Sequence, residues 1–404
     1  MAGLLARAVL PIFHDLGPNS LLQIQKSPVF LRKAARCWSS EAAPAVKITA
    51  PRTSVHHPGL HTQDHLGLWY TLQPDAVKQL FGHGGIPMQY VTQCKTFAET
   101  CLMIRKPALT AIDYIKRTNL SLPPNKFILY GNDGVGKSLS LVHITHFLSE
   151  DGWLLIHLPW APRWRRGFKE IAQSASVPGR YDHPLDAVMW LQHFKSQNSE
   201  LLKTLQLVTS EKYMWSRREV TEVGVPLSEL IETGISRARY ASDCIMALAT
   251  ELKQYATAKR CKVAVVADGI NTFFCTSSRY RLEDLTYLNP EKFTIHQAFL
   301  QLFGNDWRNG IVVGSVDRLA NDGHRRDSYL PRYLLRQKGW ETLDPFIPIL
   351  VSNYNELEMQ SIVDYYVDRR WLQNEKGASD VGRWELASLS GCNPYTLMHV
   401  TKSL

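Results

Sequence analysis

Residues 131–138 read Gly131-Asn132-Asp133-Gly134-Val135-Gly136-Lys137-Ser138 and match the pattern G-x-x-x-x-G-K-[ST] at every fixed position. A short apolar run at 126–130 precedes this octet and predicts a buried strand, while residues 138–147 predict a helix. Chance alone produces such an octet in roughly one chain in a hundred of this length. A strand before it and a helix after it make an accident rarer still, so the octet predicts a phosphate-binding loop (P-loop).

The residue types of the octet suit a bound nucleotide. Its three glycines allow backbone conformations that other residues resist, and they let the chain approach phosphate oxygens closely. Consecutive backbone N–H groups then point into one concavity at the positive end of the following helix. Lys137 supplies a positive charge for the β- and γ-phosphates, and the Ser138 hydroxyl is a ligand for Mg²⁺. We therefore expect all eight residues to bind nucleotide.

A second part of the site is predicted at the end of the apolar run 263–268. Asp268 closes this run, where a buried acid is costly unless a cation lies nearby. It is expected to hold Mg²⁺ together with Ser138; the alternative is an acid that caps the next segment. The next residue is Gly269, whereas many fast P-loop ATPases carry a Glu there. Its absence favours slow hydrolysis, or a nucleotide kept as a structural ligand.

The motifs do not decide which base the nucleotide carries or whether the nucleotide is hydrolysed. No N-K-x-D element follows residues 311–315, so the guanine-reading device of small GTPases is missing. GTP, GDP and ATP are all compatible with the octet. Ser315 ends the run and is a candidate sensor of the γ-phosphate, or an ordinary serine at a strand end. No catalytic residue is identified by the sequence.

Apolar runs separated by helical patterns predict an α/β fold. The expected strands are 126–130, 153–158, 263–268, 311–315 and 346–351. Continuous apolar strands of this kind indicate a parallel sheet covered by helices on both faces. Helices are expected at 185–207 and 227–259, and residues 96–115 predict two helices divided at Pro107. A nucleotide-binding domain with a helical insertion is thus expected over 91–352, followed by a C-terminal helical unit over 353–404.

The first ninety residues predict two segments of a different character. Residues 1–40 hold five Lys or Arg but a single acid, Asp15, with apolar residues between them. This composition is typical of a mitochondrial transit peptide, the alternative being a flexible basic tail. Residues 41–90 predict an irregular arm rich in His, Pro and Gly. His57, His61 and His65 share a four-residue spacing, but Pro58 and Gly59 interrupt the helix that would bring them together as metal ligands.

Composition narrows the classes of protein. The 404 residues carry a net charge of +9, which favours polyanionic partners such as RNA, or else an evenly spread basic surface. The seven cysteines lie far apart without C-x-x-C spacing, so a disulfide scaffold or zinc ribbon is excluded and a reducing compartment fits better. No uninterrupted apolar run is long enough to span a bilayer, so no transmembrane segment is expected.

Residues 160–166, Trp-Ala-Pro-Arg-Trp-Arg-Arg, combine aromatic and basic side chains directly after the second strand. Arginine contacts phosphates bidentately and tryptophan stacks on unpaired bases, so this segment is a candidate RNA contact. The alternative is a loop whose tryptophans pack on the domain. Both interpretations fit the sequence equally well.

Several stretches resemble the GTP-binding death-associated proteins of the mitochondrial ribosomal small subunit. These stretches are Gln93-Cys-Lys-Thr-Phe-Ala-Glu99, Cys101-Leu-Met-Ile-Arg-Lys-Pro-Ala108, the octet, Val265-Val-Ala-Asp-Gly-Ile-Asn271 and Leu343-Asp-Pro-Phe-Ile-Pro-Ile-Leu-Val-Ser-Asn-Tyr-Asn355. The resemblance implies an AAA-like P-loop fold, bound GTP or GDP, and a place in the mitochondrial matrix within the small-subunit head. It also implies contacts with ribosomal RNA, neighbouring ribosomal proteins and the large subunit, and an association with apoptosis. The family's nucleotide-binding positions fall on Gly134, Gly136, Lys137, Ser138 and Asp268.

Two functions follow from these observations. The first is a structural GTP-binding protein of the mitochondrial small ribosomal subunit that supports mitochondrial translation. The second is a P-loop NTPase of the matrix that acts as a remodelling or ribosome-assembly factor. Because Gly269 replaces the expected Glu, binding is favoured over fast turnover, and a slow GTPase stays open.

Overall fold

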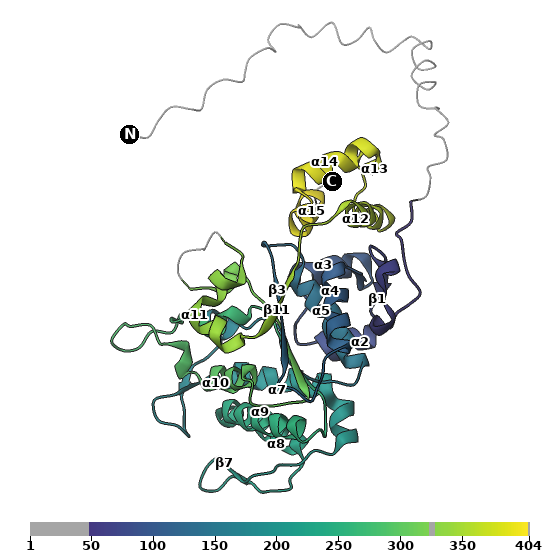
Figure 1. Ribbon diagram of the computed structural model, residues 1–404. Coiled ribbons are helices and arrows are strands. Elements are labelled where there is room, and N and C mark those ends of the chain that lie inside the picture. Colours follow the sequence, from purple (N-terminus) through teal and green to yellow (C-terminus); the bar gives the residue numbers. More distant parts are fainter. Residues whose placement is uncertain (1–47, 323–327, 403–404) are drawn as a thin grey trace, which may run out of the picture. The chain divides into compact units, whose positions relative to one another are not determined.

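The computed structural model describes residues 48–322 and 328–402 (Figure 1). Its centre is a parallel sheet of five strands, β3 (Asn125–Tyr130), β4 (Leu154–Leu158), β9 (Val263–Ala267), β10 (Gly310–Ser315) and β11 (Phe346–Leu350). They lie in the order β11-β3-β10-β9-β4, and every neighbouring pair is parallel. This AAA-like P-loop arrangement confirms the predicted fold class, and each predicted strand agrees with the structure to within one residue at either end.

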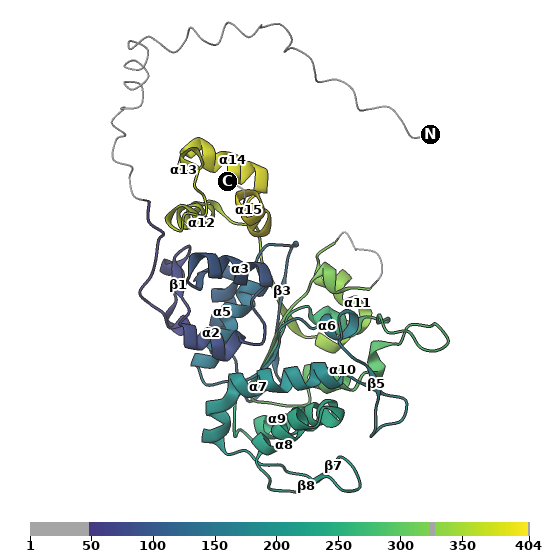
Figure 2. The same cartoon turned by 180° about the vertical axis from the view of Figure 1, so that it is seen from behind.

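Alternate residues of the strands enter two hydrophobic cores, one on each face of the sheet. Phe127 and Leu129 of β3 point into the core beneath α2 (Pro74–Phe81), α4 (Lys106–Lys116) and α5 (Lys137–Glu150). Ile128 points into the opposite core, with α7 (Pro184–Leu205), α8 (Leu227–Ser236), α9 (Ala241–Thr257), α10 (Thr294–Leu300) and α11 (Pro331–Leu343). Figures 1 and 2 show these helices on the two sides of the sheet. Strands β3, β10, β9 and β4 are buried over most of their length because they carry apolar residues at most positions, whereas β11 leaves Ile347, Pro348 and Leu350 exposed.

The helices predicted from the sequence differ from those of the structure in three places. The expected helix 227–259 is two helices, since residues 237–240 leave the helical path between α8 and α9. Residues 96–115 were expected as two helices, but the first part ends α3 (Met88–Phe97) and then forms β2 (Cys101–Met103). Pro107 stands in the first turn of α4, where its missing N–H costs nothing. The proline therefore starts a helix here and does not divide one.

The expected arm 41–90 contains regular structure in its described part. β1 (Trp69–Thr71) pairs with β2 as an antiparallel ribbon, and α2 and the start of α3 also lie before residue 91. Trp69 stacks on Tyr365 with ring centres 4.0 Å apart, and its indole N–H donates to Ser361 at 2.9 Å. The arm thereby shares a third hydrophobic core with the C-terminal helices. The predicted transit peptide, residues 1–40, lies outside the described residues.

The chain ends in α12 (Glu356–Asp368), α13 (Glu375–Ala378), α14 (Asp380–Ser390) and α15 (Pro394–Thr401). Two short hairpins, β5–β6 (Ala172–Gln173, Tyr181–Asp182) and β7–β8 (Tyr213–Met214, Val220–Thr221), and the short helix α6 (Arg163–Arg166) complete the named elements. The six cysteines of the described region are free thiols. No helix in that region is both long enough and apolar enough to cross a membrane.

Candidate nucleotide-binding site

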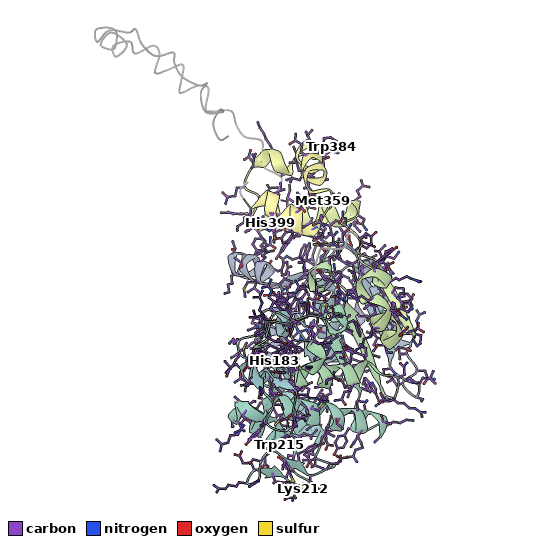
Figure 3. The ribbon with its side chains drawn as sticks, turned by 90° about the vertical axis from the view of Figure 1, so that its left-hand side faces the viewer. His183, Lys212, Trp215, Met359, Trp384 and His399 are labelled. Atoms are coloured by element: carbon purple, nitrogen blue, oxygen red, sulfur yellow. The ribbon has the colours of Figure 1, made fainter. Side chains whose placement is uncertain are left out.

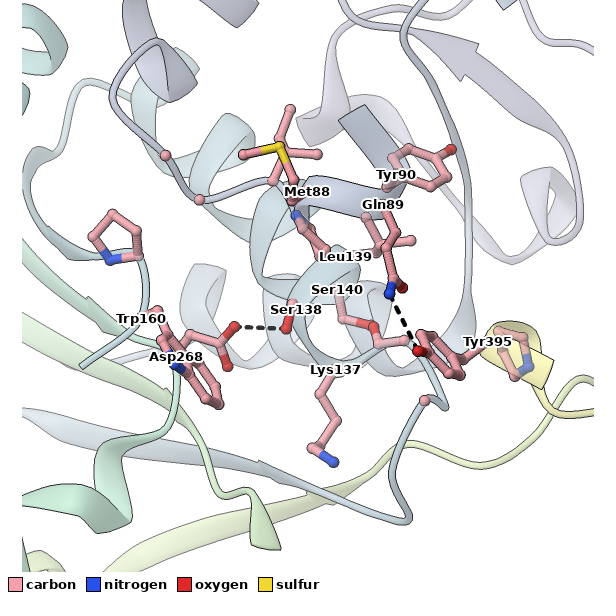
Figure 4. Close-up of a pocket in the computed structure, with 18 of the residues that line it drawn as sticks. Met88, Gln89, Tyr90, Lys137, Ser138, Leu139, Ser140, Trp160, Asp268 and Tyr395 are labelled. Atoms are coloured by element: carbon pink, nitrogen blue, oxygen red, sulfur yellow. Dashed lines mark hydrogen bonds between the residues drawn. The ribbon is translucent and has the colours of Figure 1, made fainter. Parts of the chain in front are cut away.

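The octet 131–138 forms a tight turn from β3 into α5 (Figure 4). Gly131, Gly134 and Gly136 take φ values of 152°, 76° and 98°, which L-residues rarely adopt. Space is equally restrictive: a Cβ on Gly131 would lie 2.1 Å from the carbonyl oxygen of Val351, and one on Gly134 would lie 2.5 Å from the Tyr395 Cβ. Two of the motif's glycines are therefore required by both conformation and close contact.

Lys137 begins α5 and is buried within the loop. Its ammonium group donates to the carbonyl oxygens of Gly131 at 3.0 Å and Asn132 at 2.9 Å. It also lies 3.3 Å from a carboxylate oxygen of Asp317. The cation thus lies within the glycine turn, and its bond to phosphate oxygens stays a prediction of the octet.

Asp268 follows β9 directly and lies beside the start of α5. The Ser138 hydroxyl donates to one of its carboxylate oxygens at 2.6 Å, and the Ser315 hydroxyl donates to the other. Burial raises the pKa of this carboxyl above its ordinary range. A hydroxyl and a buried carboxylate are hard oxygen ligands, and a cation beside them would offset the desolvation of Asp268. The structure thus brings together the two residues predicted to hold Mg²⁺, and their chemistry fits the ion.

Position 269, which follows the acidic strand end, is closed by neighbouring side chains. Gly269 has a φ of 73°, and a Cβ there would lie 2.8 Å from Pro162 and 3.3 Å from Trp160. A glutamate at this position would meet both side chains and the strained backbone. Because the fold excludes that glutamate, the absence noted in the sequence has a steric cause.

Three side chains and one backbone N–H group outside the octet hold the loop in place. The Asp133 carboxylate accepts hydrogen bonds from Arg318 Nε at 3.2 Å and Nη2 at 2.7 Å. Arg105 donates to the Val135 carbonyl oxygen at 2.6 Å and pairs with Glu358 at 3.0 Å. Asn393 donates to the Asp133 carbonyl oxygen at 3.0 Å, and the Tyr395 backbone N–H donates to the Gly134 carbonyl oxygen at 3.1 Å. The loop is therefore held from the segment after β10, from the start of α4 and from the C-terminal helices.

A cavity of about 1010 Å³ opens in front of the loop. Lys137, Ser138 and Asp268 line its floor (Figure 4). One side is formed by α3 and the C-terminal helices, where Gln89 donates to the Tyr395 hydroxyl at 3.2 Å. This volume lies at the upper end of the range of about 300–1,000 Å³ that is usual for small-molecule pockets. A mononucleotide therefore fits with room to spare.

Comparison with known proteins assigns the chain to a family. The family described as "Mitochondrial ribosomal death-associated protein 3" matches residues 102–400. The chain belongs to this family. It is 38% identical over 376 residues to the small ribosomal subunit protein mS29 of Mus musculus, covering 93% of this chain and 95% of that protein. The Bos taurus protein of the same name is 40% identical over 343 residues, covering 85% of each.

A likeness to solved structures is much weaker. The Aeropyrum pernix ORC2 protein in its ADP form is 13% identical, with a TM-score of 0.30, and covers 74% of this chain and 67% of its own. A score this low supports no conclusion about function. Within the death-associated protein 3 family, by contrast, identity spans nearly the whole length of the chain.

The basic and aromatic segment 160–166 is mostly structural in this family member. Arg165 donates to Thr272 and to the carbonyl oxygens of Ser277 and Ala320, and Trp164 stacks on Phe299 at 4.9 Å. The Arg166 guanidinium donates to two further carbonyl groups. Trp160 and Arg163 remain exposed, with Trp160 at the cavity. The packing interpretation holds for the second half of the segment, so it offers little to RNA.

The histidines 57, 61 and 65 do not form a metal site. His61 Nδ1 lies 3.0 Å from Nε2 of the buried His143, and His57 accepts from the Gly59 backbone N–H. No group of three or more His, Cys, Asp or Glu suited to a metal ion occurs in the described part of the chain. Sequence reasoning also missed Arg105, Arg318 and Asn393, because residues that touch the back of a loop follow no local pattern.

Proposed function

We propose that this chain holds a guanine nucleotide with Mg²⁺ at residues 131–138, as a structural ligand. The chain is a protein of the mitochondrial small ribosomal subunit, with a structural role in mitochondrial translation in the matrix, as its family membership supports. The observation that carries the nucleotide is the constellation of a glycine turn, a buried lysine at its mouth, and a serine bonded to a buried acid. Guanine is taken from the family resemblance.

The proposal assigns each side chain a task. The ammonium group of Lys137 exchanges its bonds to loop carbonyl groups for bonds to phosphate oxygens. Ser138 and Asp268 hold Mg²⁺, which neutralises phosphate charge and offsets the free-energy cost of burying the Asp268 carboxylate. Val135 and Asn132 contribute backbone, and Asp133 fixes the loop through Arg318. These tasks are all binding tasks.

Retention is favoured over rapid turnover by the surroundings of Gly269. The position that carries a water-activating glutamate in many fast P-loop ATPases is filled by Pro162 and Trp160. Orientation of the attacking water is a large part of catalysis in phosphoryl transfer. A site without that residue is expected to hydrolyse its nucleotide slowly. Residual slow hydrolysis of GTP is compatible with this arrangement.

Mass spectrometry of nucleotide extracted from the purified protein tests the proposal. We expect GDP or GTP near one equivalent per chain. Lys137→Ala should reduce occupancy and lower thermal stability, because a ligand that binds only the folded state stabilises it by mass action. Unchanged occupancy in that variant, or an adenine nucleotide in the wild type, would contradict the corresponding part of the assignment.

A remodelling or assembly NTPase is the competing function, and sedimentation separates the two. A structural protein co-migrates with the small subunit in near-stoichiometric amount, and its nucleotide stays bound through the gradient. A matrix factor forms a free pool with rapid nucleotide turnover. The closed position 269 favours the first outcome.

Two finer features are proposed on narrower grounds. Residues 1–40 act as a mitochondrial transit peptide, as their basic and acid-poor composition indicates. An intact Met1 in protein from purified mitochondria would contradict this. A role in apoptosis is carried over with the family resemblance alone, and a cell-death assay in cells depleted of the protein and rescued with Lys137→Ala would link it to the nucleotide.

A further inference from the structure

One face of α14 carries large apolar side chains in solvent. Val381, Trp384 and Leu389 are 68%, 70% and 68% exposed. With a period of 3.6 residues, these positions share one side of the helix with Asp380, Glu385 and Ser388, which are also exposed. We name these six residues the α14 face. Figure 3 shows Trp384 at the outer edge of the C-terminal helices.

The opposite side of α14 already satisfies the packing of the C-terminal unit. Gly382, Leu386 and Ser390 are buried, and Leu386 belongs to the hydrophobic core shared with β1 and α12. The helix is capped by the Ser379 hydroxyl, which accepts from the Gly382 backbone N–H at 3.2 Å. The α14 face therefore takes no part in the packing of the unit, and exposed apolar groups of this kind are typical of interaction sites.

Trp384 lacks the indole hydrogen bond that most of the described tryptophans make. The indole N–H groups of Trp69, Trp153, Trp190 and Trp215 all donate to a protein acceptor at 2.8–2.9 Å. Within residues 48–322 and 328–402, Trp384 and Trp160 have neither an indole hydrogen bond nor a ring contact, and Trp384 is the more exposed of the two, at 70% against 38%. Tryptophan is enriched among the residues that dominate protein–protein affinity.

The charge of the α14 face selects the class of partner. Asp380 and Glu385 lie among its apolar residues, and it holds no Lys or Arg. Arg383, the nearest base on the helix, is turned away and pairs with Asp364 at 2.5 Å. The face is thus acidic on a chain whose net charge is +9. Two carboxylates repel the phosphates of RNA and attract lysine or arginine.

We propose that the α14 face docks an amphipathic segment of a neighbouring protein, one that presents apolar side chains flanked by Lys or Arg. Trp384 is the anchor, and Asp380 with Glu385 sets the required charge. The site is separate from the nucleotide site and stands whether or not residues 131–138 bind a nucleotide. It adds a defined protein contact to a chain that belongs to a ribosomal family.

Photo-crosslinking within assembled small subunits tests the proposal. The full chain carries p-benzoylphenylalanine in place of Trp384 and replaces the cell's own copy. After irradiation of purified subunits, we expect conjugation to a second protein through a peptide with apolar residues and at least two Lys or Arg. The same probe at Leu285, which is 74% exposed on a different surface, should not yield that peptide. Conjugation to RNA or to residues 1–47 of this chain, or no conjugate at all, would overturn it.

Charge variants give an independent measurement with the conjugated protein as the readout. Trp384→Ala, which removes the anchor, should weaken the retention of the conjugated protein in salt-washed subunits at least about thirtyfold, the loss typical of an interface anchor. Glu385→Lys should weaken it more than Glu385→Gln, whereas an RNA partner would be held more tightly by the lysine. Because Glu385 is exposed, both variants should keep the wild-type melting temperature. Equal retention in Glu385→Lys and Glu385→Gln would refute the charge argument.

Discussion

At the scale of single residues, the site combines groups whose energies oppose one another. Asp268 is buried and its pKa is raised, so its ionised form destabilises the folded protein at neutral pH. Ser138 and Ser315 offset part of that cost by donating hydrogen bonds. A bound cation would offset the rest of this desolvation cost. The site therefore gains affinity for a cation and loses some stability when it is empty.

Asp268→Asn should therefore stabilise the nucleotide-free protein at pH 7, on the order of 1 kcal/mol. The sign follows from linkage: a raised folded-state pKa makes stability fall as pH rises through the unfolded pKa, about 3.9, and on to the folded pKa. The variant should also gain less from added GTP and Mg²⁺. Melting scans with and without ligand measure both effects. Glu283→Gln, at an exposed acid that has no hydrogen bond or ion pair within the described residues, should change neither, and a less stable apo variant with full ligand gain would contradict the account.

Gly269→Ala is expected to destabilise the protein by more than its backbone conformation alone requires. Gly269 and Gly152 share a φ of 73°, but a Cβ at 152 meets nothing within 4 Å, whereas a Cβ at 269 meets Pro162 at 2.8 Å. Gly152→Ala should cost about 1 kcal/mol, the ordinary penalty of a left-handed residue. Gly269→Ala should cost about 1–3 kcal/mol more, through the clash. Urea unfolding compares the two, and equal losses would show that position 269 is open.

At the scale of elements, the C-terminal helices serve the loop as well as their own core. Asn393 caps α15 by accepting from the backbone N–H groups of Tyr395 and Thr396, both at 3.1 Å. The same side chain donates to the Asp133 carbonyl oxygen at 3.0 Å. One amide therefore joins the start of a helix to the tip of the P-loop, about 260 residues earlier in the chain.

Asn393→Asp separates the two roles, because a carboxylate still caps the helix but cannot donate to the loop. It would also face a carbonyl oxygen with negative charge. We expect thermal stability to change little and nucleotide affinity to fall about tenfold, the value of one hydrogen bond with some repulsion. Asn374→Asp makes the same change at the cap of α13, where the side chain accepts from Lys376 N–H at 3.0 Å, and should leave affinity unchanged. Equal affinities for the two variants would remove the proposed link.

Element prediction from the sequence succeeded where a local pattern decides the structure. Four of the five apolar runs became strands that are buried on both faces, because such burial leaves a continuous apolar signature, and the fifth became the largely exposed edge strand β11. It failed at residues 101–103, whose three apolar residues fit a helix or a strand equally. Pairing with Trp69–Thr71, thirty residues away, decides for the strand. At the site, the octet and Asp268 were predictable because spacing carries their chemistry, whereas Arg105 and Arg318 reach the loop only through the tertiary fold.

At the scale of the whole molecule, buried histidines give the fold its dependence on pH. Burial lowers the pKa of several imidazoles, to about 4 for His146 and His183 and about 3 for His157 and His296, and well below its ordinary value for His143. They lie in both cores, on each side of the sheet. Acid therefore acts on the entire described unit and not on one site.

Stability should fall steeply as pH drops from about 6.5, the unfolded pKa of histidine, toward 4. In this window the unfolded chain binds protons that the folded chain excludes, and each such group contributes up to about 1.4 kcal/mol per pH unit. Asp243, whose pKa burial raises to about 6, acts in the opposite direction, as do Asp182 and Asp268 with their raised pKa values, but these acids are outnumbered by the histidines. His296→Gln keeps a donor within reach of the Phe273 carbonyl oxygen, which accepts from His296 Nε2 at 2.9 Å, and the variant removes one titrating group. Urea midpoints measured between pH 7 and 4.5 should decline less steeply in that variant, and identical slopes would show that His296 is protonated in the folded state.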